Sequence, residues 1–135
     1  MRNFLLLIVY LCIPFISYSQ TEVVKGRIIG EKLENAVGAE ILNGRTKHKV
    51  NADGNGIYNI DAIVGDTLTF YFVGYTKEKR IVKDQSHIDV LLMNKNVNDL
   101  GAIWTKKQWK KANKQIEKRY SQLEGEAQKT GKWNY

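Results

Sequence analysis

The chain has 135 residues and a formal net charge of +7, with 43% hydrophobic and 26% charged residues. This composition is ordinary for a folded domain, and it argues against wholesale disorder and against a multi-span membrane protein. A single cysteine excludes a disulfide framework. Once an N-terminal signal is subtracted, the length fits one domain rather than two.

The first nineteen residues have the layout of a secretory signal peptide. Arg2 precedes an apolar run from Phe4 to Ile16, and the small residues Ser17 and Ser19 stand before Gln20. A charged start, an apolar middle and small residues before the cut are typical of such signals. The apolar run is shorter than the roughly twenty residues that span a bilayer. We therefore predict a signal peptide at residues 1–19 and a protein located in the periplasm or associated with the outer membrane.

Cys12 lies inside the apolar run, with Leu11 before it. A lipoprotein processing site requires small residues at that point, so acylation of this cysteine is the weaker alternative. After removal of the signal no cysteine remains, which excludes disulfides, thiolate catalysis and cysteine–zinc sites.

From about residue 23 to residue 104, apolar residues alternate with polar ones, and turn residues interrupt the pattern. The clearest inward-facing sets are Leu68, Phe70 and Phe72, then Ile88, Val90 and Leu92. Short alternating strands between glycine-rich turns are typical of an antiparallel sandwich or barrel.

The last thirty residues have helical periodicity instead. Apolar residues at spacings of three or four predict an amphipathic helix at residues 106–130, and residues 131–135 are expected to fray. The apolar stripe consists of Trp109, Ala112, Ile116, Tyr120, Leu123 and Ala127. Thr105 and Gln108 have the spacing of an N-terminal capping box.

The charge is concentrated in this helical tail. Residues 20–103 contain 11 basic and 11 acidic side chains, whereas residues 104–135 contain nine basic and three acidic ones. A candidate contact surface opposite the apolar stripe consists of Lys107, Lys110, Lys111, Lys114, Lys118 and Lys129. These lysines either solvate a helix packed on the sandwich or bind an acidic partner, such as lipid head groups, an acidic glycan or an acidic protein. Nucleic acid is not an expected partner of an exported protein.

Catalytic and metal-binding motifs are not recognisable. His87 and Asp89 share one face of a strand, which fits an exposed polar face. A partial match to a calcium-binding loop occurs at Asp53-Gly54-Asn55-Gly56. Ile57 and Val64 occupy two of the expected ligand positions, so a turn is favoured. We expect no catalytic residues, no cofactor and no metal.

The order of segments resembles the carboxypeptidase-regulatory-like (peptidase-associated) domain, which is abundant in exported proteins of Bacteroidetes-type bacteria. The match covers about Glu22 to Thr105, although Asn35-Ala36-Val37 stands where the family usually has a proline. The Gly65–Phe70 block, followed by Gly74-Tyr75, is the most diagnostic part. The segments that carry the resemblance are Val24–Ile29, Ala36–Ile41, Val50–Ile60, Gly65–Phe70, Phe72–Tyr75 and Val90–Leu92.

The resemblance implies an all-β, transthyretin-like Greek-key sandwich of about seven strands at residues 20–105, followed by the C-terminal helix. It also implies an accessory module without catalytic residues. Structural roles are expected for Gly26, Asp53, Gly56, Tyr58, Gly74, Tyr75, Trp104, Trp109, Ile116 and Leu123.

The sequence therefore predicts a non-enzymatic exported module of the cell envelope. Its expected partner is an unknown envelope protein or acidic envelope component, and peripheral membrane contact stays open. The alternative is an accessory subunit of an outer-membrane uptake complex, or of a peptidase encoded elsewhere.

Overall fold

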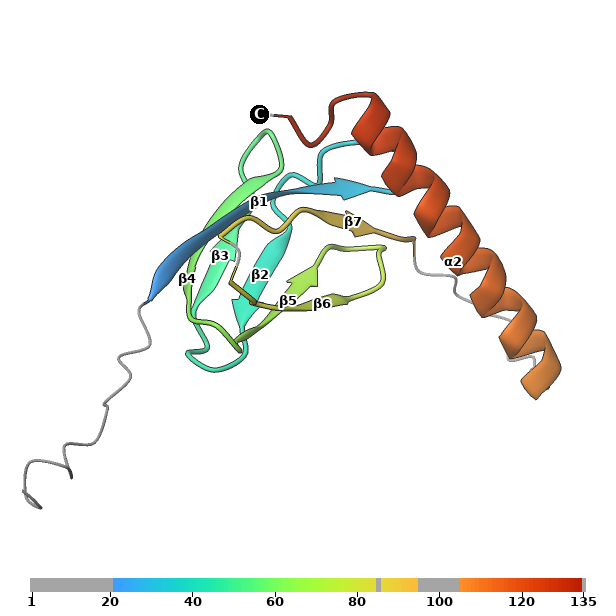
Figure 1. Ribbon diagram of the computed structural model, residues 1–135, viewed down its shortest axis with the longest axis horizontal. Coiled ribbons are helices and arrows are strands. Elements are labelled where there is room, and N and C mark those ends of the chain that lie inside the picture. The colour runs from blue at the N-terminus through green and yellow to red at the C-terminus, as the bar shows by residue number, and fades with distance from the viewer. Residues whose placement is uncertain (1–20, 85, 95–104, 135) are drawn as a thin grey trace, which may run out of the picture.

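The computed structural model describes residues 21–84, 86–94 and 105–134. The predicted signal peptide and Trp104 lie outside the described residues. Within these residues, seven strands precede one helix (Figure 1). They are β1 (Glu22–Gly30), β2 (Glu40–Asn43), β3 (Lys49–Asn51), β4 (Ile57–Ala62), β5 (Thr67–Tyr71), β6 (Glu78–Ile81), β7 (Val90–Leu92) and α2 (Lys106–Lys129).

The strands form two sheets. One has the order β4-β1-β7, in which β1 pairs antiparallel with β4 and parallel with β7. The other has the order β3-β2-β5-β6, and its neighbours are all antiparallel. These two sheets and the C-terminal helix confirm the predicted mainly β domain.

The main core is made by the alternating residues of both sheets. Val24 and Ile28 of β1 are fully buried with Leu68 and Phe70 of β5. Tyr58 of β4 lies edge-on to Phe70 with ring centroids 5.4 Å apart. Its hydroxyl donates a hydrogen bond of 2.8 Å to the carbonyl oxygen of Ile88. The inward-facing positions predicted from period-two alternation thus build this core.

A second, smaller core lies on the other face of the β4-β1-β7 sheet. Ile29 and Leu91 are buried there against Ala127 of α2. Alternation predicts that Leu91 points to solvent, because its neighbours Val90 and Leu92 point inward. That prediction is wrong, since the helix packs on the outer face of β7 and buries Leu91, while Val90 and Leu92 are buried in the main core.

At two positions, neighbouring backbone lies so close that only glycine fits without a shift. A Cβ atom on Gly26 would lie 1.9 Å from the carbonyl oxygen of Ile88, and one on Gly56 would lie 2.5 Å from that of Ile28. Asp53 closes the adjacent turn, because its Oδ1 accepts hydrogen bonds from the backbone amides of Asn55 and Ile57.

Asp66 is a buried carboxylate, only 4% exposed, that ties two segments of the chain together. Its oxygens accept hydrogen bonds from the side chains of Arg45 and Asn43, at 2.6 Å and 2.8 Å, and from the backbone amide of Ile63. The Arg45 guanidinium is the main reason that the pKa of Asp66 is lowered to about 2. The network fixes the turn between β4 and β5 against the end of β2.

We predict that Asp66→Asn lowers the free energy of unfolding by about 2 kcal/mol at neutral pH. Because the folded-state pKa is below the ordinary value, this contribution is present above about pH 4 and is lost as the pH falls towards 2. Urea unfolding at several pH values checks this, with the exposed Asp84→Asn as the control. An equal loss at neutral and acidic pH would contradict the ionic role of Asp66.

Gly74 has a φ of +87°, in the region that β-branched residues rarely adopt. No atom lies within 4 Å of a Cβ built there, so the constraint is conformational rather than steric. We predict that Gly74→Val destabilises the domain by more than about 1 kcal/mol. Gly54→Val is the control, because Gly54 has similar space and no positive φ. Equal thermal melting of the two variants would refute this prediction.

Candidate contact surface on helix α2

Helix α2 begins with the capping box that the sequence predicts. The backbone amide of Thr105 donates to Oε1 of Gln108, and Oγ1 of Thr105 accepts from the amide of Gln108. The first turn contains Lys106 and Lys107 but no acidic residue. Cations at this end oppose the helix dipole, so the cap offsets an unfavourable distribution of charge.

Two polar contacts fix the middle of α2 to the β domain. Nε of Arg119 lies 2.5 Å from Oε1 of Glu31, whose side chain is only 10% exposed. The guanidinium of Arg80 in β6 donates a hydrogen bond of 2.8 Å to the hydroxyl of Tyr120. Burial is the main reason that the pKa of Tyr120 is raised. Both contacts orient one side of the helix towards the sheets.

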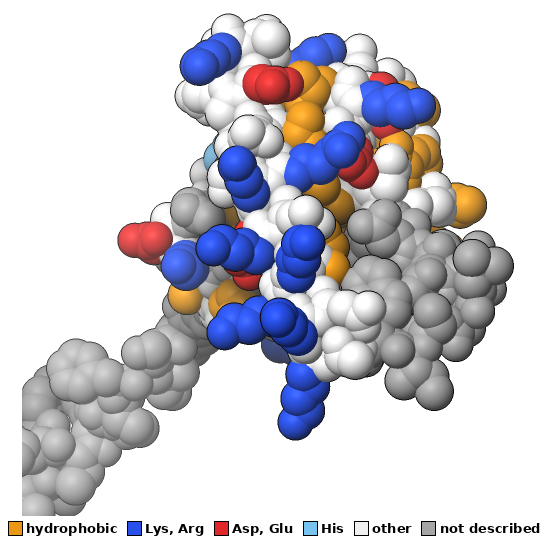
Figure 2. Space-filling view, turned by 90° about the vertical axis from the view of Figure 1, so that its right-hand side faces the viewer, with side chains coloured by type: hydrophobic (Ala, Val, Ile, Leu, Met, Phe, Trp, Pro, Cys, Tyr) orange, Lys and Arg blue, Asp and Glu red, His pale blue; other side chains and the backbone are white. Residues whose placement is uncertain are grey.

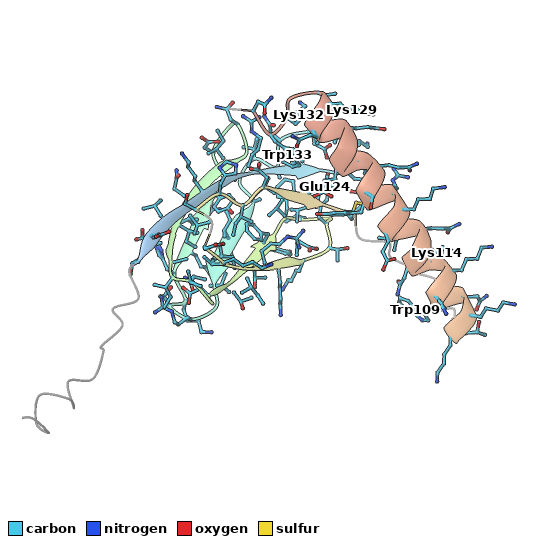
Figure 3. All side chains as sticks on the ribbon, in the orientation of Figure 1. Trp109, Lys114, Glu124, Lys129, Lys132 and Trp133 are labelled. Atoms are coloured by element: carbon cyan, nitrogen blue, oxygen red, sulfur yellow. The ribbon has the colours of Figure 1, made fainter. Side chains whose placement is uncertain are left out.

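The residues that follow α2 also contact the β domain, at Arg27 and at the small core. The backbone carbonyl of Lys132 accepts a hydrogen bond of 2.6 Å from the Arg27 side chain, and its amide donates to the carbonyl of Ala127. Trp133 packs against the small core of Ile29, Leu91 and Ala127 (Figure 3). The prediction that residues 131–135 fray is therefore wrong for residues 131–134, while residue 135 lies outside the described part.

The residues of the predicted apolar stripe are more buried in the C-terminal half of the helix than at its start. Leu123 packs with the small core, and Ile116 is half-buried. Trp109, near the start of α2, is 56% exposed. The half of the helix that carries Trp109 and Lys114 extends away from the sheets (Figures 1 and 3). The expectation that Trp109 covers the sandwich does not match this exposure.

All six lysines of the candidate contact surface are exposed. Figure 2 shows basic side chains along the side of α2 that faces away from the sheets. Within residues 21–84, 86–94 and 105–134, no carboxylate forms an ion pair with any of these lysines. Arg119, in contrast, is paired with Glu31. The structure thus separates one basic residue that anchors the helix from six that face outwards.

His87 and Asp89 contact each other and the backbone of β1. Nε2 of His87 lies 3.0 Å from Oδ2 of Asp89, and Oδ1 of Asp89 accepts a hydrogen bond from the backbone amide of Arg27. The carboxylate therefore links the segment before β7 to β1. In the described part of the chain, no three metal-ligating side chains of His, Cys, Asp or Glu come together.

A shallow groove of about 500 Å³ runs between α2 and the segment around β7. Its lining includes Asp89, Leu91, Glu124 and Trp133. The groove is open, and its floor is the small core that holds α2 in place. Among the described helices, none has the length and apolar character needed to cross a bilayer.

Comparison with known proteins gives little further information. A scan against protein-family models finds no match, and a search of curated proteins finds none either. Among solved structures, the chain is similar to a streptococcal ancillary pilin, with 14% sequence identity and a TM-score of 0.39. The similarity covers 58% of this chain and 33% of the pilin chain. A match at this level carries no argument about function.

The two tryptophans of the tail provide a test of how α2 is anchored. We predict that Trp133→Ala lowers the free energy of unfolding by about 2 kcal/mol, because it removes a half-buried ring from the small core. Trp109→Ala, on the exposed half, should cost at most about 1 kcal/mol. Urea unfolding compares the two variants. A larger loss for Trp109→Ala would place the main anchor at the other end of the helix.

Proposed function

We propose that this protein is a non-enzymatic exported module of the cell envelope, whose contact surface for an acidic partner is the basic face of α2. This basic face consists of Lys107, Lys110, Lys111, Lys114, Lys118 and Lys129. The observation that carries the proposal is the concentration of charge. Six exposed lysines share one side of a single helix, and the described residues offer them no carboxylate partner.

Repulsion along the helix supports the same proposal. Lys107 and Lys111, Lys110 and Lys114, and Lys114 and Lys118 are like-charged pairs four residues apart. Each such pair opposes helix formation by a few tenths of a kcal/mol in low salt. An acidic surface would relieve this repulsion, so binding would also stabilise the exposed half of α2.

We further propose that the β domain is a carboxypeptidase-regulatory-like domain of transthyretin-like topology, exported by the signal at residues 1–19. The sequence pattern of Glu22–Thr105 supports this assignment, and seven strands in two sheets are compatible with it. A physical role accounts for Asp66 in the most diagnostic block, because it accepts hydrogen bonds from three residues, Asn43, Arg45 and Ile63. The domain would then act as a scaffold that presents the helix.

The proposed contact surface can be tested on an immobilised soluble polyanion, such as dextran sulfate. The test variant replaces four lysines of α2 by glutamine, and the matched control replaces four exposed lysines of the β domain. The test positions are Lys107, Lys110, Lys111 and Lys114, and the control positions are Lys25, Lys32, Lys79 and Lys83.

Both variants lose the same net charge, so they differ only in where the charge is removed. We expect the α2 variant to elute at much lower salt than the native chain, and the control to elute close to it, because clustered cations bind a polyanion together. Equal shifts for the two variants would mean that net charge alone governs binding, and the proposed surface would be rejected.

A further inference from the structure

We propose that the partner of the basic face is the phosphate-bearing surface of a lipid bilayer, on which α2 lies flat without inserting. This inference rests on the proposed function and names the partner for the same surface. It is carried by the shape of the lysine array, by the residues between the lysines, and by the position of the β domain behind the helix.

The lysine array is long and follows one side of the helix. Lys107 and Lys129 are 22 positions apart on a helix of 24 residues, which places them about 33 Å apart along its axis. Figure 2 shows the basic side chains spread along the outward side of α2 rather than gathered around a hollow. A planar array of anions can meet such a row along its whole length, whereas a compact acidic ligand would meet only part of it.

The residues between the lysines argue against a protein partner. On the helical projection, the basic face also includes Glu117 at its edge and Ser121, Gln122, Gly125 and Gln128, all exposed, and no apolar side chain. Stable protein interfaces are depleted in lysine and are anchored by buried aromatic or apolar residues. The basic face has no such anchor, so it is suited to a diffuse field of negative charge.

The type of basic residue supports the same partner. Arg119, the one arginine of α2, forms the ion pair with Glu31, and every basic residue of the basic face is a lysine. Arginine is suited to directed, bidentate pairing, whereas lysine is a compact and strongly hydrated point charge. A row of lysines is therefore suited to electrostatic attraction by head-group phosphates without a fixed geometry.

The β domain dictates how the helix can approach a bilayer. The apolar side of α2 packs on Ile29 and Leu91, and Trp109 is on that apolar side of the helical projection. The β domain covers the C-terminal part of this side, so inserting that part into lipid would bring the β domain into the bilayer as well. Docking through the lysines keeps the β domain on the water side, so the bound state depends on charge and not on insertion.

The experiment is cosedimentation of the chain without residues 1–19 with two kinds of vesicle, one containing phosphatidylglycerol and one of phosphatidylcholine alone. We expect binding only to the first kind, with loss of binding at about 1 M salt, where screening is nearly complete. The four-lysine variant of α2 should bind about 600-fold more weakly, at about five-fold per lysine. The control variant of the β domain should bind within about three-fold of the native chain.

Trp109→Ala tests the orientation of the helix. Since Trp109 lies opposite the basic face, this variant should bind vesicles like the native chain, and far-ultraviolet circular dichroism checks that its helix is retained. Loss of vesicle binding in Trp109→Ala with the helix retained, or binding that survives high salt, would mean insertion and would overturn the proposal.

The two proposals fail in different ways. If the α2 lysines govern binding to dextran sulfate but the protein does not bind phosphatidylglycerol vesicles, the proposal of a bilayer partner is rejected and the proposal of the contact surface is kept. That outcome would assign the surface to an acidic glycan or protein. If the α2 variant matches the control on both probes, the contact surface itself is wrong.

Discussion

The packing of α2 on the outer face of the β4-β1-β7 sheet is the constraint on which the rest of the structure depends. Ala127 is fully buried against Ile29 and Leu91, and the Arg119–Glu31 ion pair fixes the helix about its own axis. Because side chains three and four positions apart share a side of a helix, burying Ala127 and Leu123 leaves the lysines on the opposite side. One small apolar contact therefore determines which charges face outwards.

The lysine-rich side of α2 depends on the packing of its apolar side for stability. An isolated helix with repeated like charges four residues apart, and lysines in its first turn, is weak in water. Packing of the C-terminal half supplies the stability that this pattern removes, and the capping box at Thr105 supplies part of it at the other end. The β domain thus makes it possible for a highly cationic helix to exist in the absence of a bound partner.

The sequence predicts the local features well and the long-range contacts poorly. Period-two alternation identifies the inward residues Leu68 and Phe70, and the spacing of Thr105 and Gln108 identifies the helix start, because both signals depend on near neighbours. Leu91 is buried although the same alternation predicts that it points to solvent, since its burial depends on a helix that follows it in the chain. Likewise, the pairing of Asp66 with Arg45 spans 21 residues and leaves no local pattern.

The same distinction applies to the contact surface. The uneven distribution of charge and the helical projection are enough to place the lysines opposite the apolar stripe, because both follow from the order of residues alone. They do not reveal that Trp133, beyond the expected helix end, packs on the small core while Trp109 is exposed. That difference matters physically, because an anchor at the C-terminal end leaves the lysine-rich half of α2 extending away from the sheets (Figure 1). A helix held from its middle to its C-terminal end presents the lysines of its N-terminal half beyond the sheets.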